Sequence, residues 1–282
     1  MTGVPMIDGK TLLIAHLGYP TESFTAPMIY NPYFEKAGVN AVVMPLGVQA
    51  EAYPEVLRAL LSLTNFHGAL ITMPHKVTTL GLVDEASPTA RIAGACNALR
   101  KEADGRLRGD MFDGEGFLRG LQRRGRAVAG ARALVVGCGG VGSAIAASLA
   151  RAGAAALSLY DVKTAAAEAL AGRLRQHYPA LAVGTGNPDP AGHDIVVNAT
   201  PLGMGAEDPL PLDAGRLDPA AVVGEVVLSR EVTPLLAAAR ARGCDTQVGT
   251  DMLFEMIPAY LEFFGFPAAT AEELRQVARL AS

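Results

Sequence analysis

The sequence is poor in cysteine and in charge. Its three cysteines are odd in number, far apart and without histidines at metal-ligand spacing: Cys96, Cys138 and Cys244. This pattern argues against a disulfide framework or a zinc site, so we expect no metal and a reducing, cytoplasmic setting. Charged residues make up 18% of the chain and the net charge is −4, which gives no electrostatic surface suited to nucleic acid or an anionic membrane.

Long apolar runs are also absent. None approaches the roughly 20 residues that span a bilayer. Residues 1–10 show no basic segment followed by an apolar one, as a targeting segment would. We therefore expect a small-molecule partner, with no nucleic acid and no membrane as partner.

Apolar runs alternate with helical patterns in two series. Up to about residue 87, runs at 12–18, 41–47 and 68–74 enclose helical patterns near 27–37 and 49–63, which predicts βαβαβ. The second series has predicted strands at 133–136, 156–161, 194–200 and 221–227 and helices after the first, at 164–178 and near 233–242. The intervening helices imply parallel strands. The segment 105–125 predicts a turn, a short polar strand and a helix ending in arginines, which suits a connection between domains.

A glycine turn joins the first strand of the second series to its helix, through Gly137, Gly139, Gly140, Val141 and Gly142. In this context glycines let a pyrophosphate approach main-chain N–H groups at the positive end of a helix. The alternative is a tight turn that only packs helix on strand.

Asp161 lies 19 residues after Gly142, at the end of the next predicted strand. An acidic side chain there can bind both ribose hydroxyls and repel a 2′-phosphate, which favours NAD over NADP. Asp161 could instead be a solvated turn residue, and Lys163 leaves some use of NADP open.

Four further segments resemble the shikimate dehydrogenase family. ITMPHK (71–76), GACNALR (94–100), DGRLRGDMFDGEGF (104–117) and DIVVNATPLGM (194–204) are similar to the family's VTVPFK, GAVNTL, DGxLxGxNTDGxGF and DxxINATPxGM. The spacing also agrees, with 21 residues from Lys76 to Asn97 and 16 from Asn97 to Asp113. The resemblance covers nearly the whole chain. It implies an oxidoreductase of aromatic amino acid biosynthesis or quinate metabolism.

The resemblance also implies a catalytic pair, Lys76 and Asp113, at a cleft between a substrate domain and a Rossmann domain. Oxidising a secondary alcohol releases a proton from oxygen, which a group within hydrogen-bond reach must accept or relay. Asp113 would orient the lysine and accept from a substrate hydroxyl. Asn97 and Thr72 would contact the substrate, or serve as structural hydrogen-bonding groups alone.

On the cofactor side, the resemblance places a group of residues at the carboxyl ends of the strands, where ligands bind in open α/β sheets: Asn198, Ala199 and Thr200. Gly203 and Met204 would lie beside the nicotinamide. Gly249, Asp251 and Met252 resemble the family's late glycine-containing turn, with a looser match.

Seven positions depart from the family towards apolar residues. The family's carboxylate-binding segment, roughly GxPIxHSxSPxxHN, aligns with residues 18–31, so Phe24 and Ala26 stand where it has serines. Leu70 stands for an asparagine, Leu228 for a tyrosine, Met256 for a glutamine, and Met111 with Phe112 for Asn-Thr. Each unsatisfied polar group costs about 1 to 3 kcal/mol, which predicts inefficient turnover of shikimate. A shifted pose could instead bind the carboxylate through His75, Ser23, Thr25 or Arg230.

We therefore predict two α/β domains, an N-terminal substrate domain (1–113 with 249–282) and a Rossmann-type, doubly wound parallel-sheet domain (114–248). The predicted reaction is hydride transfer between NAD and a cyclic hydroxy acid or related alcohol, other than or besides shikimate. Phe24, Ala26, Thr72, Asn97 and Met256 are the predicted substrate contacts. A shikimate or quinate dehydrogenase with an unusual pocket and a catalytically silent nucleotide sensor remain alternatives. A homodimer is possible.

Overall fold

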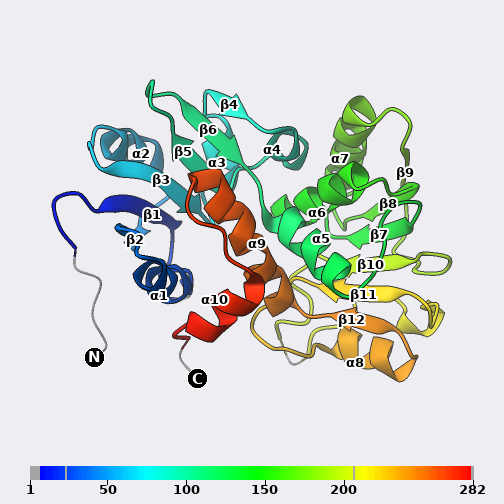
Figure 1. The fold of residues 1–282 in the computed structure, drawn as a ribbon. Helices are drawn as coiled ribbons and strands as arrows, with labels where there is room; N and C mark the ends of the chain where they lie inside the picture. Colours follow the sequence, from blue (N-terminus) through cyan, green and yellow to red (C-terminus); the bar gives the residue numbers. More distant parts are fainter. Residues whose placement is uncertain (1–6, 23, 206, 281–282) are drawn as a thin grey trace. The chain divides into compact units, whose positions relative to one another are not determined.

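The computed structural model describes residues 7–22, 24–205 and 207–280, which form two compact units (Figure 1). The first unit runs up to Phe112 and resumes at Ile257, and the second is Asp113–Met256. The predicted division after residue 113 lies next to this one. The chain was predicted to return to the first domain at residue 249. This is eight positions before the observed return at Ile257, because residues 249–256 pack with the second unit.

The first unit contains a mixed six-stranded sheet in the order β2-β1-β3-β5-β6-β4. Its strands are β1 (Leu12–Gly18), β2 (Ala41–Gly47), β3 (Phe66–Ile71), β4 (Glu85–Ala86), β5 (Ala98–Lys101) and β6 (Leu107–Asp110). Its helices are α1 (Pro27–Ala37), α2 (Tyr53–Leu61), α3 (Lys76–Leu80), α4 (Pro88–Ala93) and α10 (Ala271–Val277), with the end of α9 (Gly249–Phe264). β1, β2 and β3 are parallel, as the βαβαβ pattern predicts, whereas β5 is antiparallel to β3 and β6.

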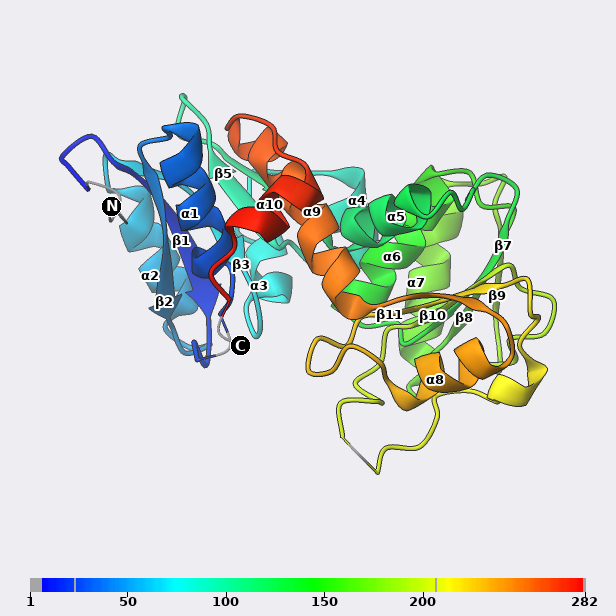
Figure 2. The same cartoon turned by 60° about the horizontal axis from the view of Figure 1, so that its bottom comes forward.

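Alternation along the strands sorts side chains between the two faces of this sheet. Ala15 and Leu17 of β1 join Tyr53 and Leu57 of α2 in one buried core. The residue between them, His16, therefore points to the opposite face of the sheet. Helix α1 lies on the face of the sheet away from α2 (Figure 2). Leu70 of β3, which stands where the family has asparagine, is in register with His16 and shares this face.

The second unit is a six-stranded parallel sheet in the order β12-β11-β10-β7-β8-β9. Its strands are β7 (Arg132–Val136), β8 (Ala156–Tyr160), β9 (Ala182–Thr185), β10 (Ile195–Asn198), β11 (Val222–Glu225) and β12 (Asp245–Gln247). Helices α5 (Asp113–Arg123), α6 (Gly140–Arg151) and α7 (Thr164–His177) lie on one face, and α8 (Pro234–Ala241) lies on the other (Figure 1). Counted from β7, this is the 3-2-1-4-5-6 order of a doubly wound dinucleotide-binding fold, as predicted.

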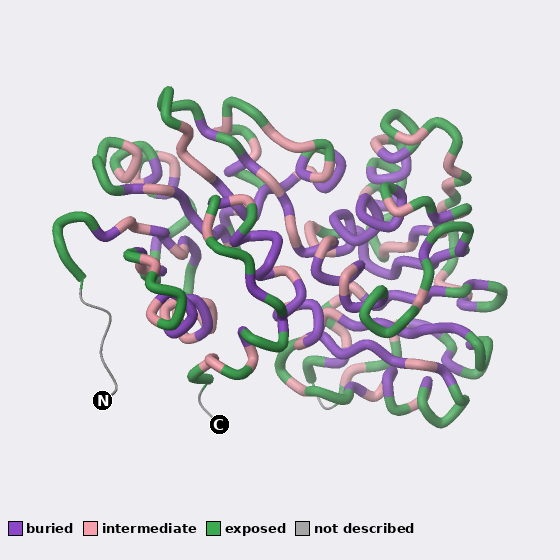
Figure 3. Tube along the Cα trace, in the orientation of Figure 1, coloured by how far each residue is buried: buried purple, intermediate pink, exposed green. Residues whose placement is uncertain are grey.

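Burial accounts for the apolar runs of the second series. β10 is buried at every position and β7 at all but its first residue (Figure 3). A parallel strand covered by helices on both faces reads as a continuous apolar run, which is how these two strands were recognised. Among the described residues, no helix is both long and apolar enough to cross a membrane.

Candidate active site

Three predicted site residues of the first unit meet at the carboxyl ends of its strands β1 and β3. Thr72 follows β3 and donates from its backbone N–H to the carbonyl of Leu17 in β1 at 2.9 Å. Asn97 precedes β5, and its carbonyl accepts from the backbone N–H of Ile71 at 2.8 Å. Lys76 begins α3, and its carbonyl accepts from Cys96, next to Asn97, at 2.8 Å. The backbone thus brings Thr72, Lys76 and Asn97 to the carboxyl end of β1 and β3.

Asn97 is held from several sides. It is 1% exposed, and its Oδ1 accepts from the backbone N–H of Phe112 at 2.9 Å. Its own N–H donates to the carbonyl of Asp110 at 3.0 Å, and its carbonyl also accepts from the Tyr260 hydroxyl at 3.3 Å. These bonds give Asn97 a structural role beside the substrate contact that the resemblance predicts.

Phe24 lies over the end of β1. Its ring stacks on the imidazole of His16, with ring centroids 4.0 Å apart and an interplanar angle of 28°. A Cβ built on Gly18 would lie 2.3 Å from Thr72 Cγ2 and 2.8 Å from Phe24 Cζ, so only glycine lets these two side chains approach. The predicted positions Phe24 and Thr72 are thereby brought together, and Ala26 follows directly before α1.

His16 is a residue of this site that the sequence analysis missed. It pairs in register with Leu70 of β3, so both side chains share one face of the sheet. Burial, reinforced by the charge of Lys76, lowers the pKa of His16 to about 4. The imidazole is therefore neutral at pH 7. A signal was present, since a polar residue interrupts the apolar strand LLIAHLG.

His75, one of the residues considered for an alternative carboxylate contact, belongs to the core. It is 1% exposed, its Nε2 lies 2.8 Å from the carbonyl of Val48, and its ring stacks on Tyr53 at 3.9 Å. These contacts give His75 a structural role in the core. Ser23 lies outside the described residues, whereas Thr25 and Arg230 are half-buried and keep the alternative open.

The glycine turn has the geometry of a pyrophosphate cradle. Gly137 has a φ of 98°, in the left-handed region that favours glycine. A Cβ on Gly142 would lie 1.9 Å from the carbonyl oxygen of Gly137, so the start of α6 can pack on the turn only with glycine there. A Cβ on Gly139 would meet nothing within 4 Å, which leaves open space in front of the turn. Gly140 and Val141 open the 12-residue α6, so the residues present fit a dinucleotide.

Asp161 stands beside this turn. Its Oδ2 accepts from the backbone N–H of Cys138 at 2.8 Å, and its Oδ1 accepts from that of Lys163 at 2.8 Å. Each carboxylate oxygen retains a further lone pair for a hydroxyl donor. The position therefore suits the predicted ribose contact, and it also gives Asp161 a part in holding the turn.

Asn198, at the end of β10, shapes the loop that follows it. Its amide donates to the carbonyl of Leu202 at 2.9 Å and to Glu225 Oε2 at 3.0 Å. Its Oδ1 accepts from both the N–H and the hydroxyl of Thr200, at 3.0 and 2.6 Å. This uses every hydrogen-bonding position of the Asn198 side chain. The Asn198 side chain therefore has a structural role in shaping this loop.

Glu225 is a second ionisable residue that the sequence analysis missed. It is fully buried at the end of β11, in register with Asn198, and its Oε1 accepts from the Thr233 hydroxyl at 2.8 Å. Burial raises the pKa of Glu225 to about 7, although the hydrogen bonds from Thr233 and Asn198 act in the opposite direction. The carboxyl group therefore titrates near neutral pH.

The start of α9 packs tightly in the second unit. A Cβ on Gly249 would lie 2.1 Å from the carbonyl oxygen of Val227, and Met252 is 5% exposed. Met256 is half-buried, and its Cβ would lie 2.7 Å from a Cβ on Gly116 of α5. Asp113, the first residue of α5, is also buried. Leu228, which replaces the family's tyrosine, is 49% exposed.

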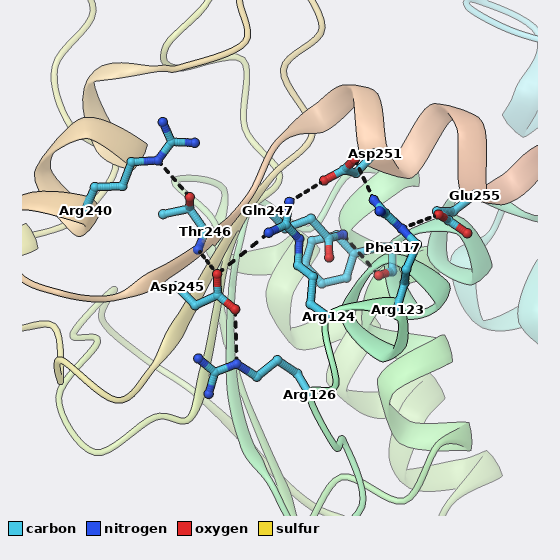
Figure 4. A network of polar contacts seen from close by, with 10 residues as sticks. All are labelled: Phe117, Arg123, Arg124, Arg126, Arg240, Asp245, Thr246, Gln247, Asp251 and Glu255. Carbon is cyan, nitrogen blue, oxygen red and sulfur yellow. Dashed lines mark hydrogen bonds and ion pairs between the residues drawn. The ribbon is translucent and has the colours of Figure 1, made fainter. Parts of the chain in front are cut away.

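The arginines that end α5 hold this part of α9 (Figure 4). Asp251 accepts from Arg123 Nη2 at 2.8 Å and from Arg124 Nη2 at 2.7 Å. Arg123 Nε also lies 2.6 Å from a carboxylate oxygen of Glu255. The cluster predicted to connect domains therefore ties α5 to α9 within the second unit. Among the residues that the structure describes, no group of three or more His, Cys, Asp or Glu side chains is placed to hold a metal ion.

Comparisons with known proteins bear on the family and the fold. The family described as "Shikimate dehydrogenase substrate binding domain" matches residues 17–99. A shikimate dehydrogenase (NADP(+)) from Rubrobacter xylanophilus is 39% identical over 259 residues, which cover 89% of each chain.

Solved structures show the same fold over almost the whole length. Shikimate 5-dehydrogenase from Listeria monocytogenes, in complex with shikimate and NAD, is 26% identical with a TM-score of 0.90, covering 96% of this chain and 98% of that one. The 5-ketofructose reductase of Gluconobacter sp. strain CHM43 is 26% identical with a TM-score of 0.86, covering 96% and 99%. Together with the motifs at both sheets, these matches show that the chain belongs to the shikimate dehydrogenase family, whose members are oxidoreductases acting on CH–OH groups.

Proposed function

We propose that the protein catalyses reversible hydride transfer between NAD and the hydroxyl-bearing carbon of a cyclic hydroxy acid or related alcohol. The observation that carries the proposal is the convergence of Lys76, Thr72 and Asn97 at the carboxyl ends of β1 and β3 in the first sheet. A general acid/base group and two hydrogen-bonding side chains are what alcohol oxidation requires of a protein. The glycine turn of the second unit supports the proposal that the cofactor is a nicotinamide dinucleotide.

The glycine turn at 137–142 would hold a nicotinamide cofactor, which would supply the hydride acceptor of the proposed reaction. Lys76 Nζ takes up the proton that leaves the substrate hydroxyl, and returns it in the reverse direction. Asp113 is its proposed partner, orienting the ammonium group and accepting from a substrate hydroxyl. We assign substrate binding chiefly to the first unit and dinucleotide binding to the second unit, Asp113–Met256.

The substrate is proposed to differ from shikimate or to include other compounds beside it. Phe24 and Ala26 offer no side-chain donor to a carboxylate where the family has serines, and Leu70 none where it has asparagine. The relatives span different compounds, since one is named for shikimate and another for 5-ketofructose. Their names also support the second candidate, a shikimate or quinate dehydrogenase with an unusual pocket.

Replacing Lys76 by alanine tests the reaction. We expect Lys76→Ala to lower kcat by about 10² or more, because the proton of the hydroxyl loses its acceptor, while NADH still binds. Steady-state rates with a panel of alcohols and an NADH-fluorescence titration measure the two effects. Lys10→Ala, at an exposed position, is the control. Undiminished turnover by Lys76→Ala would refute the role assigned to Lys76. If the unmodified protein binds NADH but turns over no alcohol, the alternative of a catalytically silent nucleotide sensor would be favoured.

Asp161 is proposed to set a preference for NAD. Its carboxylate would repel a 2′-phosphate, and Val162, 86% exposed beside it, stands where NADP-using relatives commonly have arginine. We expect a higher kcat/KM with NAD than with NADP. The double change Asp161→Asn with Val162→Arg should raise the NADP-to-NAD ratio of kcat/KM by about tenfold or more. A clear advantage of NADP in the unmodified protein would refute this preference.

A further inference from the structure

The end of β1 carries a polar side chain where the surrounding substitutions have removed polar groups. His16 and Leu70 are opposite one another in register on one face of the sheet. Leu70 replaces an asparagine of the family, and Phe24, whose ring stacks on His16, replaces a serine. Compared with the family pattern, the polar side chain on this face therefore lies on β1 itself, and no longer on β3 (Leu70) or in the loop that follows β1 (Phe24).

His16 also has an unmet hydrogen-bonding atom. Its Nδ1 is buried, and no described residue forms a hydrogen bond with it. A buried polar atom without a partner costs free energy, which a ligand that supplies the partner would recover. The imidazole lies beside the proposed reaction site, because it stacks on the Phe24 ring, and Phe24 and Thr72 both approach Gly18 closely, at 2.8 and 2.3 Å from a Cβ built there.

We propose that His16 is a specificity-determining substrate contact, and that the substrate group it binds is an uncharged hydroxyl or carbonyl rather than a carboxylate. This inference rests on the proposed function and narrows its substrate class.

The surroundings of His16 favour an uncharged group. The imidazole is neutral at pH 7, so it offers one hydrogen bond and no charge. A desolvated carboxylate needs several donors or a cation dedicated to it, and Phe24, Ala26 and Leu70 provide none. Lys76 is assigned to the reacting hydroxyl. A hydroxyl or carbonyl, in contrast, is satisfied by a single imidazole and packs against the Phe24 ring.

Shikimate and its methyl ester form a matched pair for the test, because esterification removes the negative charge of the carboxyl group and adds only a methyl group. We expect the unmodified protein, saturated with NAD, to oxidise the ester with a kcat/KM about tenfold above that of the acid. His16→Leu should lower kcat/KM for the ester by about five- to tenfold, chiefly through KM, and change the value for the acid less than twofold. The ester-to-acid ratio would not respond to a merely structural role of His16.

Two further variants keep the outcome clear. His16→Asn retains an amide that can hydrogen-bond and should recover part of the ester activity, and it carries the comparison if His16→Leu does not fold. His177→Leu, at the exposed end of α7, should leave both substrates unchanged. A higher kcat/KM for the acid than for the ester would overturn this inference. So would an ester-to-acid ratio that neither His16 variant changes, if Lys76→Ala still abolishes turnover. Either result would leave the proposed function standing. Absence of turnover with either compound and with other alcohols would overturn both.

Discussion

Glu225 places an ionisable group inside the Rossmann unit, where the Asn198 amide and the Thr233 hydroxyl, both uncharged, donate to its carboxyl group. Because its pKa in the folded protein is raised to about 7, the folded state keeps the proton where the unfolded state, near 4.5, has lost it. The stability that this difference contributes is complete below about pH 4.5. It is lost as the pH rises through about 7.

Replacing Glu225 by glutamine removes this titration. The amide can accept from Asn198 and donate to the Thr233 hydroxyl, so the packing is retained. We expect Glu225→Gln to gain stability relative to the unmodified protein as the pH rises from about 4.5 to 8, by as much as about 3 kcal/mol. Urea unfolding across this range measures it, with Glu51→Gln, at an exposed position, as the control. The lowered pKa of His16 makes the free energy of unfolding rise with pH. This contribution is the same in the unmodified protein and in Glu225→Gln, so it cancels in the difference between them. A difference that does not vary with pH would contradict the prediction.

Sequence reasoning identified the residues of the site that belong to a motif, and it missed those whose role depends on a neighbour in space. Lys76, Thr72 and Asn97 were predicted together and lie together at the carboxyl ends of β1 and β3. His16 and Glu225 were read only as parts of apolar strands. Their settings depend on Phe24 and Leu70 in one case and on Asn198 and Thr233 in the other, and strand periodicity contains no information about such partners.

At the scale of elements, the apolar runs predicted the central strands because those strands are buried on both faces. The strands that were missed lack this signal. β12 is only three residues long and has the polar sequence DTQ, β4 has two residues, and β9 is half-exposed at a sheet edge. The antiparallel direction of β5 could not be predicted either, since a four-residue strand reads the same in both directions.

The junction of α5, β12 and α9 gives an element-scale prediction. Asp251 accepts from two arginines and its side chain is only 12% exposed, so its loss leaves both guanidinium groups without this partner. We expect Asp251→Asn to lower the free energy of unfolding by about 1 to 3 kcal/mol, less at high salt. Asp104→Asn breaks the exposed pair with Arg106 and should cost less than about 1 kcal/mol. Urea unfolding at two salt concentrations measures both. Equal effects of the two variants would show that burial adds nothing to the Asp251 cluster.

For the whole molecule, the doubly wound order of the second unit and the mixed sheet of the first follow from the two predicted series and the family resemblance. The extent of each unit follows less well. The late glycine turn indicated a boundary at residue 249, but α9 continues through it as one helix. Its first turn is held by Arg123 and Arg124, and its later residues Tyr260 and Phe263 bond to residues of the first sheet. A helical pattern does not reveal which neighbours its successive turns have.

The shared helix α9 limits how this protein can be recombined with its relatives. A Rossmann unit transplanted from an NADP-using relative would have to end inside α9, after Met256. One residue too many or too few at that joint would rotate every later side chain by about 100° around the helix axis. Tyr260, which donates to the carbonyl of Asn97, and Phe263, whose carbonyl accepts from Arg100, would then face away from the sheet that carries Lys76. The helical phase at residue 256, more than the sequence identity of the donor, would decide whether such a chimera keeps its substrate side intact.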